Sequence, residues 1–555
     1  MPEMPGTRNV VRAGGEFLAD RPLIACGLIA LIVLAPAAGW GIPQATSEVT
    51  VRGWEVDGVS GIGVLAELSN LTSAARPDWY VAYPLFHYLL LSVAYIPYIA
   101  ILTLTGKLNH PGGVFPYGFA DPVRALAVLN MIGHAITVLM GAATIMAVFA
   151  LARRLYGTRG AVLAALLALC SAPFMFYART GNLDVPALCW TMLCFVALER
   201  CWTDGLSTGR AVACGAFAAL AVATKDQSYG LLLLPIVALL VRALRTPGSA
   251  TTATRIRLPL VLVGSGLAVF LIASGIVFRP DRFVRHLQYI TNFRETFTNV
   301  RFQTDLTVMR EPGVRGRLLL LGDMLRATSA AVGWPVVAMG LAGLVALGRS
   351  VPATRWILAA IGGFFLLVIV PIQHMQYRYA LAPAVLLSLS AAALTVRLTS
   401  RPVLLGALAI VLLAPALAGG AEVTHAMMTD ARWPASEWVN QHVAAGDTLG
   451  FFGRPHQLPY MPRGVRVEQL QLGEVETRLG VVRPRWLVVA PDYFADPLRE
   501  RSTFLPLAVY QGLRDGSLGY TLVARFESPG LLGRPLPYLP YVNPVVQLYE
   551  RRHAE

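Results

Sequence analysis

The chain has 555 residues, of which 55% are hydrophobic and only 14% charged, and its mean hydropathy is +0.57. A soluble protein cannot bury this much apolar surface, so the composition indicates a polytopic membrane protein. The net charge of +14 would suggest nucleic acid in a soluble chain, but the arginines lie mostly between apolar segments, as the positive-inside rule produces, and we expect no nucleic-acid partner.

The first apolar segment covers residues 23–40 and follows Arg8, Arg12 and Arg21. We expect it to be a retained membrane helix that begins in the cytoplasm, with a cleaved signal peptide as the alternative. The six cysteines all fall in or beside apolar segments, and their spacing does not resemble a zinc site. We therefore expect them to be packing residues rather than a disulfide framework.

The loop of residues 41–83 carries two closely spaced carboxylates, Glu55 and Asp57, near glycines and Trp54. Carboxylates beside a bilayer are either functional or well hydrated, and this stretch alone does not decide between the two. The apolar run of residues 84–104 comes next. It is long enough to cross the membrane, but its two prolines and many tyrosines favour a position at the membrane surface.

Whether residues 84–104 cross decides the topology of everything that follows. If they do not, the short basic clusters around Arg153 and Arg255 lie in the cytoplasm, and Asp184 and Lys225 lie outside. Crossing would invert this arrangement, so the positive-inside rule favours the first case. The arginine-rich loop of residues 279–317 is then external, which is acceptable because long loops obey the rule weakly. The later spans are predicted at residues 123–151, 161–176, 186–197, 211–224, 229–241, 258–278, 318–347, 356–371, 379–395 and 403–420.

From about residue 426 the composition becomes that of a soluble domain. A helix is predicted over residues 435–443, and short strands over residues 449–452, 486–490, 520–526 and 545–549. The sequence therefore predicts an all-α membrane domain of residues 1–425 with about 11–13 helices. A small α/β domain of residues 426–555 follows it outside the cytoplasm.

Several polar groups are predicted to lie at the outer ends of the spans. They are Glu55 and Asp57, Asp184, Lys225 with Asp226, and His374, Gln376 and Arg378. Each has a structural alternative: Asp184 as a helix N-cap, Lys225 paired with its neighbour Asp226, and Arg378 as an interfacial anchor. Together, acids and cations at one depth suit an anionic lipid headgroup and a proton acceptor.

Five motifs carry a resemblance to a known family. They are YPLFHYLLL, FYARTGNLDVPALCW, ATKDQSYGLLLLP, QYRYALAPAVLLSLSAA and DARWPASEWVNQHVAAGD. Their order and spacing resemble the GT-C superfamily of glycosyltransferases. Within it they resemble the glycosyltransferase family 39-type branch, which includes the dolichyl-phosphate-mannose–protein mannosyltransferases and the bacterial lipid A aminoarabinose transferase. The resemblance covers residues 23–394, and the last motif resembles the start of the branch's C-terminal domain.

The resemblance implies transfer of a sugar, usually with inversion, from a polyprenyl-phosphate carrier to a hydroxyl of a lipid, glycan or protein acceptor. It also implies a multi-pass protein of a bacterial inner membrane, with the chemistry on the outer face. Asp57 matches the catalytic base, Asp184 the second acid, and Lys225 and Arg378 positions that face the carrier phosphate. His374, Arg279 and Arg282 are further candidates for phosphate binding.

One position departs from the family pattern. The family has Asp-Glu in the first loop, whereas Gly58 follows Asp57 here and Glu55 lies two residues before it. Glu55 is therefore a possible substitute for the missing carboxylate. A divalent cation, Mg²⁺ or Mn²⁺, stays open.

The chemistry fits without the family. Attack of a hydroxyl on an anomeric carbon needs a base, and the departing phosphate needs fixed positive charge. A polytopic transporter or lipid flippase is the alternative, and an envelope scaffold a third. A transporter is expected to show broken or charged segments at mid-bilayer and two related halves. The polar groups here are predicted at helix ends and no repeat is evident, which favours a transferase.

Overall fold

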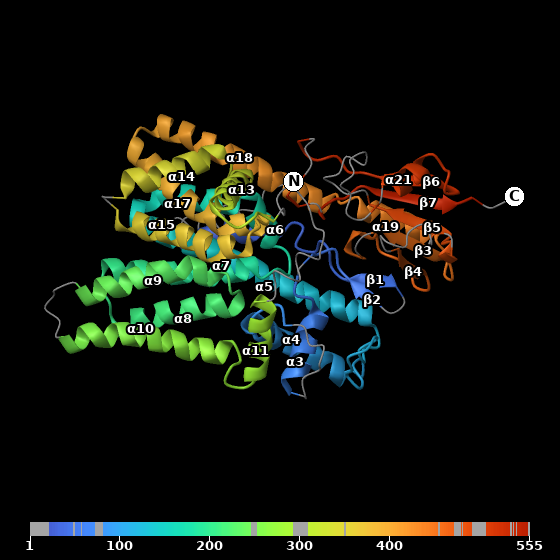
Figure 1. The fold of residues 1–555 in the computed structure, drawn as a ribbon, viewed down its shortest axis with the longest axis horizontal. Helices are drawn as coiled ribbons and strands as arrows, with labels where there is room; N and C mark the ends of the chain where they lie inside the picture. Colours follow the sequence, from blue (N-terminus) through green and yellow to red (C-terminus); the bar gives the residue numbers. More distant parts are fainter. Residues whose placement is uncertain are drawn as a thin grey trace, which may run out of the picture.

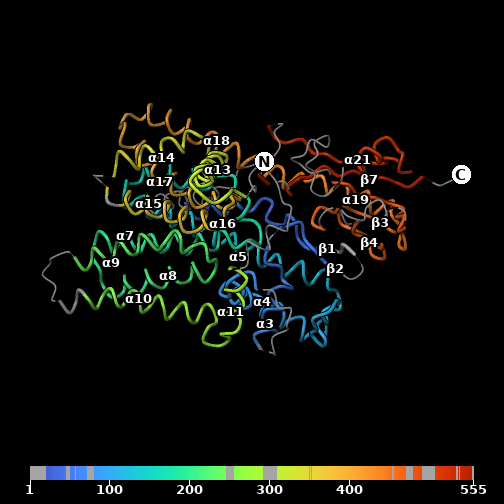
Figure 2. Tube along the Cα trace, viewed as in Figure 1, coloured from blue at the N-terminus to red at the C-terminus, as the bar shows by residue number. Residues whose placement is uncertain are grey.

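The computed structural model consists of a helical bundle and a small sheet domain at one end of it (Figures 1 and 2). The structure describes residues 21–47, 50–56, 58–72, 81–245, 252–291, 309–348, 351–452, 455–470, 481–490, 507–532 and 541–552, with the single positions 479, 505, 536, 538 and 539. The predicted fold class, a helical membrane domain with a small C-terminal α/β domain, is confirmed.

The bundle is built from apolar helices whose backbone hydrogen bonds are closed within each segment, as a bilayer requires. They are α2 (Pro22–Leu34), α5 (Pro122–Leu169), α6 (Ala172–Tyr177), α7 (Asp184–Thr203), α8 (Thr208–Thr224), α9 (Ser228–Arg245), α10 (Thr252–Ala273), α13 (Val314–Val332), α14 (Trp334–Leu347), α15 (Pro352–Phe364), α16 (Val370–Ile372), α17 (Leu381–Leu398) and α18 (Pro402–Met428). A π-helical turn, η1 (Phe365–Ile369), joins α15 to α16, and a 3₁₀ turn, η2 (Tyr377–Ala380), leads into α17.

Among the described residues, eight helices are long and apolar enough to cross a membrane, or nine if a bent pair counts as one span. The sequence-based number also includes the shorter apolar helices α2 and α8 and both arms of α5. The arms of α5 meet at Gly157, whose φ of +76° is outside the helical range. The predicted boundary at 425/426 falls inside α18.

The predicted span of residues 318–347 is wrong as a single helix. It is broken at Gly333 into α13 and α14, which bend by 116°. Gly333 has a φ of +89°, and a Cβ there would lie 2.5 Å from the Pro415 side chain. Only glycine permits this turn against α18.

A group of short elements gathers at the end of the bundle that faces the sheet domain (Figure 1). They are the hairpin β1 (Gln44–Ser47) and β2 (Thr50–Arg52), α3 (Gly61–Thr72), α4 (Phe86–Leu104) and α11 (Pro280–Thr291). The hairpin and α3 belong to the first loop and were not predicted. α5 begins at this end, where Asp121 accepts a hydrogen bond from the Arg124 backbone and Pro122 starts the helix.

The C-terminal domain is a five-stranded mixed sheet in the order β4-β3-β5-β7-β6. Its elements are α19 (Arg432–His442), β3 (Thr448–Phe452), β4 (Arg466–Leu470), β5 (Trp486–Val489), α21 (Leu507–Arg514), β6 (Tyr520–Phe526) and β7 (Val546–Arg551). β3 pairs in parallel with β4 and β5, whereas β7 pairs antiparallel with β5 and β6. The helix and four of these strands lie where the sequence predicts them. β4 and α21 were missed, because β4 is largely polar and α21 is short.

Candidate active site

Glu55 fastens the first loop to the bundle. Its Oε1 contacts His134 Nε2 of α5, and its Oε2 accepts a 2.8 Å hydrogen bond from the Gly181 backbone. The side chains of Glu55 and His134 are only 5% and 1% exposed. His134 Nδ1 lies 2.7 Å from the Ala38 carbonyl, which can only accept, so that nitrogen donates. Both oxygens of Glu55 are therefore used in holding the loop.

The departure from the family pattern at Gly58 has a steric reason. A Cβ at position 58 would lie 2.3 Å from Glu55 Oε2, so the Glu55 carboxylate occupies the space of a side chain there. The Val59 backbone donates to the Gly181 carbonyl at 2.9 Å, and Gly181 thus holds the loop on both sides of position 57. Asp57 itself lies outside the described residues.

Asp184, Lys225 and Arg378, which the sequence analysis grouped at the outer ends of the spans, line one cavity of about 40 Å³. Lys225 Nζ and Asp184 Oδ1 form a 2.6 Å ion pair, and both side chains are less than a tenth exposed. Asp184 lies in the first turn of α7 after the N-cap position Leu183, so it does not cap the helix itself. The Arg378 guanidinium receives support from Gln376 Oε1, which accepts from its Nε at 2.5 Å.

Two acceptors in this cavity have no hydrogen-bond partner among the residues that the structure describes. They are Asp184 Oδ2 and Gln227 Oε1, both fully buried. A buried acceptor without a donor costs about 1–3 kcal/mol, so a ligand or water that donates a hydrogen bond is favoured there. The volume is enough for ordered water or phosphoryl oxygens.

The electrostatics of the cavity favour an anion. Besides the two cations, the N-terminal ends of α7 and α9 lie at the cavity, through Asp184 and Ser228. Helix N-termini carry a partial positive charge that attracts anions.

His374 lies near this cavity but does not line it. It is buried, and its Nδ1 lies 3.1 Å from the Ile372 carbonyl. Burial, together with the charge of Arg378, lowers the pKa of His374 below its ordinary value of 6.5. The ring is therefore neutral at pH 7 and supplies no charge to a phosphate.

Arg279 and Arg282 connect α11 to the first loop. Arg279 donates to the carbonyls of Asn70 and Leu71 at the end of α3, at 2.6 and 3.3 Å, and pairs with Asp281. Arg282 is 1% exposed, forms an ion pair with Glu67 of α3 and donates to the Tyr83 carbonyl. These contacts place both arginines at α3, not in the cavity of Asp184.

The first loop is also fastened to the C-terminal domain. The Trp54 indole donates to the Leu458 carbonyl at 3.0 Å and stacks on Tyr460, with ring centroids 4.5 Å apart. Arg432 lies over the Trp54 ring at 4.2 Å and makes a fully buried fork to Asp430. The segment around Asp57 is thus held between α5, the start of α7 and the sheet domain.

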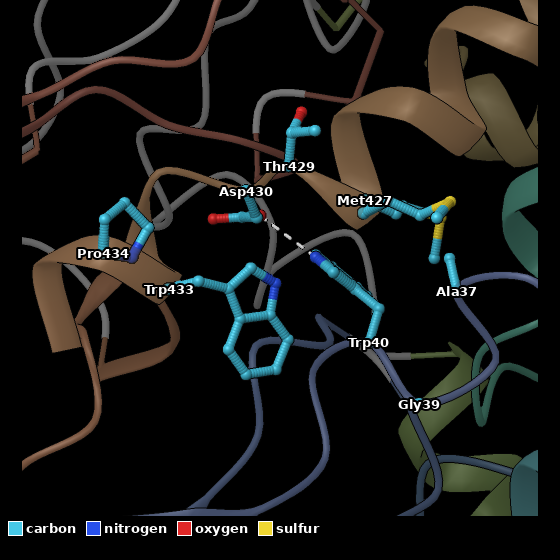
Figure 3. Close-up of a pocket in the computed structure, with 9 residues that line it drawn as sticks. Ala37, Gly39, Trp40, Met427, Thr429, Asp430, Trp433 and Pro434 are labelled. Atoms are coloured by element: carbon cyan, nitrogen blue, oxygen red, sulfur yellow. Dashed lines mark hydrogen bonds between the residues drawn. The ribbon is translucent and has the colours of Figure 1, made fainter. Parts of the chain in front are cut away.

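A larger cavity of about 560 Å³ lies beside this joint and is lined mainly by apolar side chains (Figure 3). Figure 3 shows the Trp40 indole donating to Asp430, which also accepts from Arg432 and from the Asn543 backbone. The one carboxylate in this cavity is therefore fully engaged. For that reason we locate the polar chemistry in the smaller cavity.

A divalent cation does not fit the described residues. Among them, no three His, Cys, Asp or Glu side chains gather in an arrangement that could hold a metal. Glu55 is engaged by His134 and Gly181, so it is not an available ligand. No described residue is therefore assigned to Mg²⁺ or Mn²⁺.

Some residues of this region escaped sequence reasoning. His134 is a lone histidine in an apolar span, a signal that was overlooked. Gly181, Glu67 and His286 gave no signal, because each matters through a partner far away in the sequence, and Gln227 gave none because only the fold brings it to the cavity. The closest pair among these contacts, His286 with Asp226, is 60 residues apart.

Comparison with known proteins supports the assignment of the fold. A family model described as dolichyl-phosphate-mannose-protein mannosyltransferase matches residues 132–277, which include Asp184 and Lys225 but not the first loop. No curated protein sequence matches the chain. ArnT from Cupriavidus metallidurans in the apo state is 15% identical with a TM-score of 0.50, over 95% of this chain and 98% of that one.

Two further solved structures are similar at lower scores. ArnT bound to undecaprenyl phosphate is 14% identical with a TM-score of 0.48, over 94% of this chain and 97% of that one. The oligosaccharyltransferase AglB from Archaeoglobus fulgidus is 12% identical with a TM-score of 0.43, over 96% and 89%. The family match and the ArnT fold confirm the resemblance drawn from the sequence motifs: the chain has the fold of the GT-C glycosyltransferases.

Proposed function

We propose that this protein is a membrane glycosyltransferase that moves a sugar from a polyprenyl-phosphate carrier to an acceptor hydroxyl, with inversion. The observation that carries the proposal is the cavity of Asp184, Lys225 and Arg378. It combines two cations and two helix N-termini, which suit a phosphate, with two unpartnered acceptors, which suit hydroxyl donors. A glycosyl phosphate offers both groups in one molecule.

Asp57 is the proposed base. Glu55 and Val59 hold its loop against Gly181, three residues before Asp184. A carboxylate in that segment would take the proton of the attacking hydroxyl as the new bond to the anomeric carbon forms. The bond from the anomeric carbon to the phosphate oxygen breaks on the opposite side, its electron pair goes to that oxygen, and Lys225 and Arg378 stabilise the negative charge that the phosphate gains. Glu55 acts in this scheme by holding the loop, not as the base.

We propose that this end of the bundle lies on the outer face of a bacterial inner membrane, with α4 along the membrane surface. α4 packs beside the first turns of α5, near Leu126, Leu129 and Gly133, which lie beyond the end of α2. Its opposite side leaves Val93, Ile96 and Leu104 exposed, as expected for a helix embedded in headgroups. The polar groups of the proposed site lie at one end of the bundle rather than at mid-bilayer, which argues against the transporter alternative.

The direct test is sugar transfer by the purified protein from labelled polyprenyl-phosphate sugars, together with binding of undecaprenyl phosphate. Arg378→Ala should weaken lipid binding more than ~tenfold, since a charge-assisted contact contributes on the order of 1.5–3 kcal/mol. Lys225→Gln should weaken it similarly, because the amide remains polar but carries no charge.

Arg466→Ala is the matched control, because Arg466 is exposed and lies on β4 in the sheet domain. It should leave lipid binding unchanged. If both Lys225→Gln and Arg378→Ala bind undecaprenyl phosphate as the wild type does, the cavity is not the phosphate site. Absence of transfer with every labelled donor would remove the proposed activity.

A further inference from the structure

His286 of α11 contacts two separate parts of the chain, the segment before α4 and the turn between α8 and α9. Its Nδ1 lies 3.0 Å from the Val81 carbonyl, which precedes α4, and its Nε2 lies 3.1 Å from both oxygens of Asp226. The ring is 1% exposed. A carbonyl and a carboxylate only accept hydrogen bonds, so both ring nitrogens donate and the ring is an imidazolium.

Asp226 lies in the turn that presents Lys225 to the cavity. α8 ends at Thr224 and α9 begins at Ser228, so residues 225–227 form the whole connection. The Tyr229 backbone donates to the Asp226 carbonyl at 2.9 Å, and the Lys225 ammonium reaches Asp184 at 2.6 Å. Neighbouring side chains of one short turn thus point to the cavity and to α11.

The charged groups that face His286 come from two elements. Asp226 approaches from the turn between α8 and α9, and Arg282 lies one turn earlier on α11 itself. The charge of Arg282 is balanced by Glu67 of α3. Val81, in the segment before α4, contributes only its carbonyl.

We propose that His286 is a positioning residue, which as an imidazolium clamps the Lys225–Gln227 turn to α11 and so fixes Lys225 in the phosphate cavity. The inference rests on the proposed function, since it takes that cavity as the site of the carrier phosphate. The clamp acts through Asp226, and His286 does not touch the substrate.

The clamp has a definite pH dependence. Burial by itself lowers the pKa of His286, but the hydrogen bond and charge of Asp226 outweigh it and raise the pKa above the ordinary 6.5. A raised folded-state pKa adds stability that is fully present below the unfolded value and is lost as the pH rises through the folded value. The clamp therefore holds in acid and loosens in alkali.

The first measurement needs no lipid. Thermal unfolding of the full-length protein is compared with that of His286→Gln from about pH 5.5 to 8.5. We expect the melting temperature of the wild type to exceed that of the variant at low pH, with the difference shrinking as the pH rises. His442→Gln is the control, because His442 is exposed on α19 and stacks only on Trp438. It should show no such trend.

The second measurement is binding of undecaprenyl phosphate over the same pH range. His286→Gln should bind ~5-fold more weakly or worse at low pH, the lower end of ordinary coupling between sites, and approach the wild type at high pH. The lipid phosphate itself titrates near pH ~6, but it does so equally for both proteins, so the affinity ratio isolates His286. Asp226→Asn should reproduce the effect, and the double variant should add little to either single one.

The outcomes of the two measurements distinguish the clamp, its effect on Lys225 and the proposed function. A melting difference that is the same at every pH would overturn the imidazolium clamp. A pH-dependent melting difference with equal lipid affinities would show that the clamp does not act on Lys225, and would overturn the positioning role. If the wild type itself fails to bind undecaprenyl phosphate, the proposed function fails first, and the inference with it.

Discussion

At the scale of single residues, we propose separate tasks for two neighbouring carboxylates of the first loop, Glu55 and Asp57. Glu55 is buried and bound at both oxygens by His134 and Gly181. A carboxylate that already accepts from two groups is a poor base, because taking a further proton would break a contact. Glu55 also fills the space that a side chain at position 58 would need.

This division predicts different outcomes for two conservative variants. Asp57→Asn should fold and bind undecaprenyl phosphate nearly normally, while its turnover falls by ~100-fold or more, the usual loss for a positioned base. Glu55→Gln should lower the melting temperature as well as the turnover, because it removes the charge opposite His134. Transfer rates and thermal unfolding of both variants check this.

The control is Asp515→Asn, since Asp515 is exposed in the sheet domain and bonds only to nearby Ser517. It should change neither rate nor stability. If Asp57→Asn keeps more than about a tenth of the turnover while Glu55→Gln loses it with normal stability, then Glu55 is the base.

At the scale of elements, the joint between the first loop and the sheet domain depends on Arg432. Its guanidinium makes a fork to Asp430 and donates to the carbonyls of His456 and Tyr541, at 2.6 and 2.8 Å. A planar fork with five donors can meet all of these acceptors at once, whereas an ammonium cannot.

Arg432→Lys should therefore destabilise this joint although it keeps the charge. Each lost hydrogen bond to a charged group costs about 1.5–3 kcal/mol, and the carbonyls left without a donor add to it. We expect faster proteolysis of the sheet domain and reduced transfer, because Trp54 loses the planar guanidinium above its ring. The exposed pair of Arg466 with Glu468 offers the comparison: Arg466→Lys should be silent. Equal proteolysis of both variants would mean that Arg432 does not hold the domains together.

At the scale of the whole molecule, the elements of the site and the sheet domain gather at one end of the bundle (Figure 2). The first loop, α11, the turn between α8 and α9, and η2 all contribute to that end. At the other end, Arg154 pairs with Asp204, and Arg242 lies over the Trp202 ring. Basic residues at one end and the site at the other agree with the orientation that the positive-inside rule predicts.

Cysteine labelling in a background that lacks the six native cysteines checks this orientation. A cysteine at Glu437, exposed on α19, should react with an impermeant thiol reagent in intact cells. A cysteine at Arg153, exposed at the other end, should react only after the membrane is opened. Labelling of position 153 from outside would invert the arrangement and place the site in the cytoplasm.

The sequence by itself determined the membrane class, most spans, the sheet domain and three of the residues that share one cavity. Apolar length and arginine placement are local properties, so they can be read without a fold. Asp184, Lys225 and Arg378 were grouped because each lies at the outer end of a predicted span, and helix ends at one depth meet. The break at Gly333 was missed, because its cause is Pro415 on a distant helix.

Only the tertiary structure decided the contacts that give these residues their roles. The pairing of Glu55 with His134, of Arg282 with Glu67 and of His286 with Asp226 joins segments 60 or more positions apart. Arg279 and Arg282 were expected at the phosphate by charge alone, but they meet carbonyls and a carboxylate of α3. The role of a buried ionisable side chain depends on the partner that balances its charge. That partner comes from whichever helix the packing brings beside it.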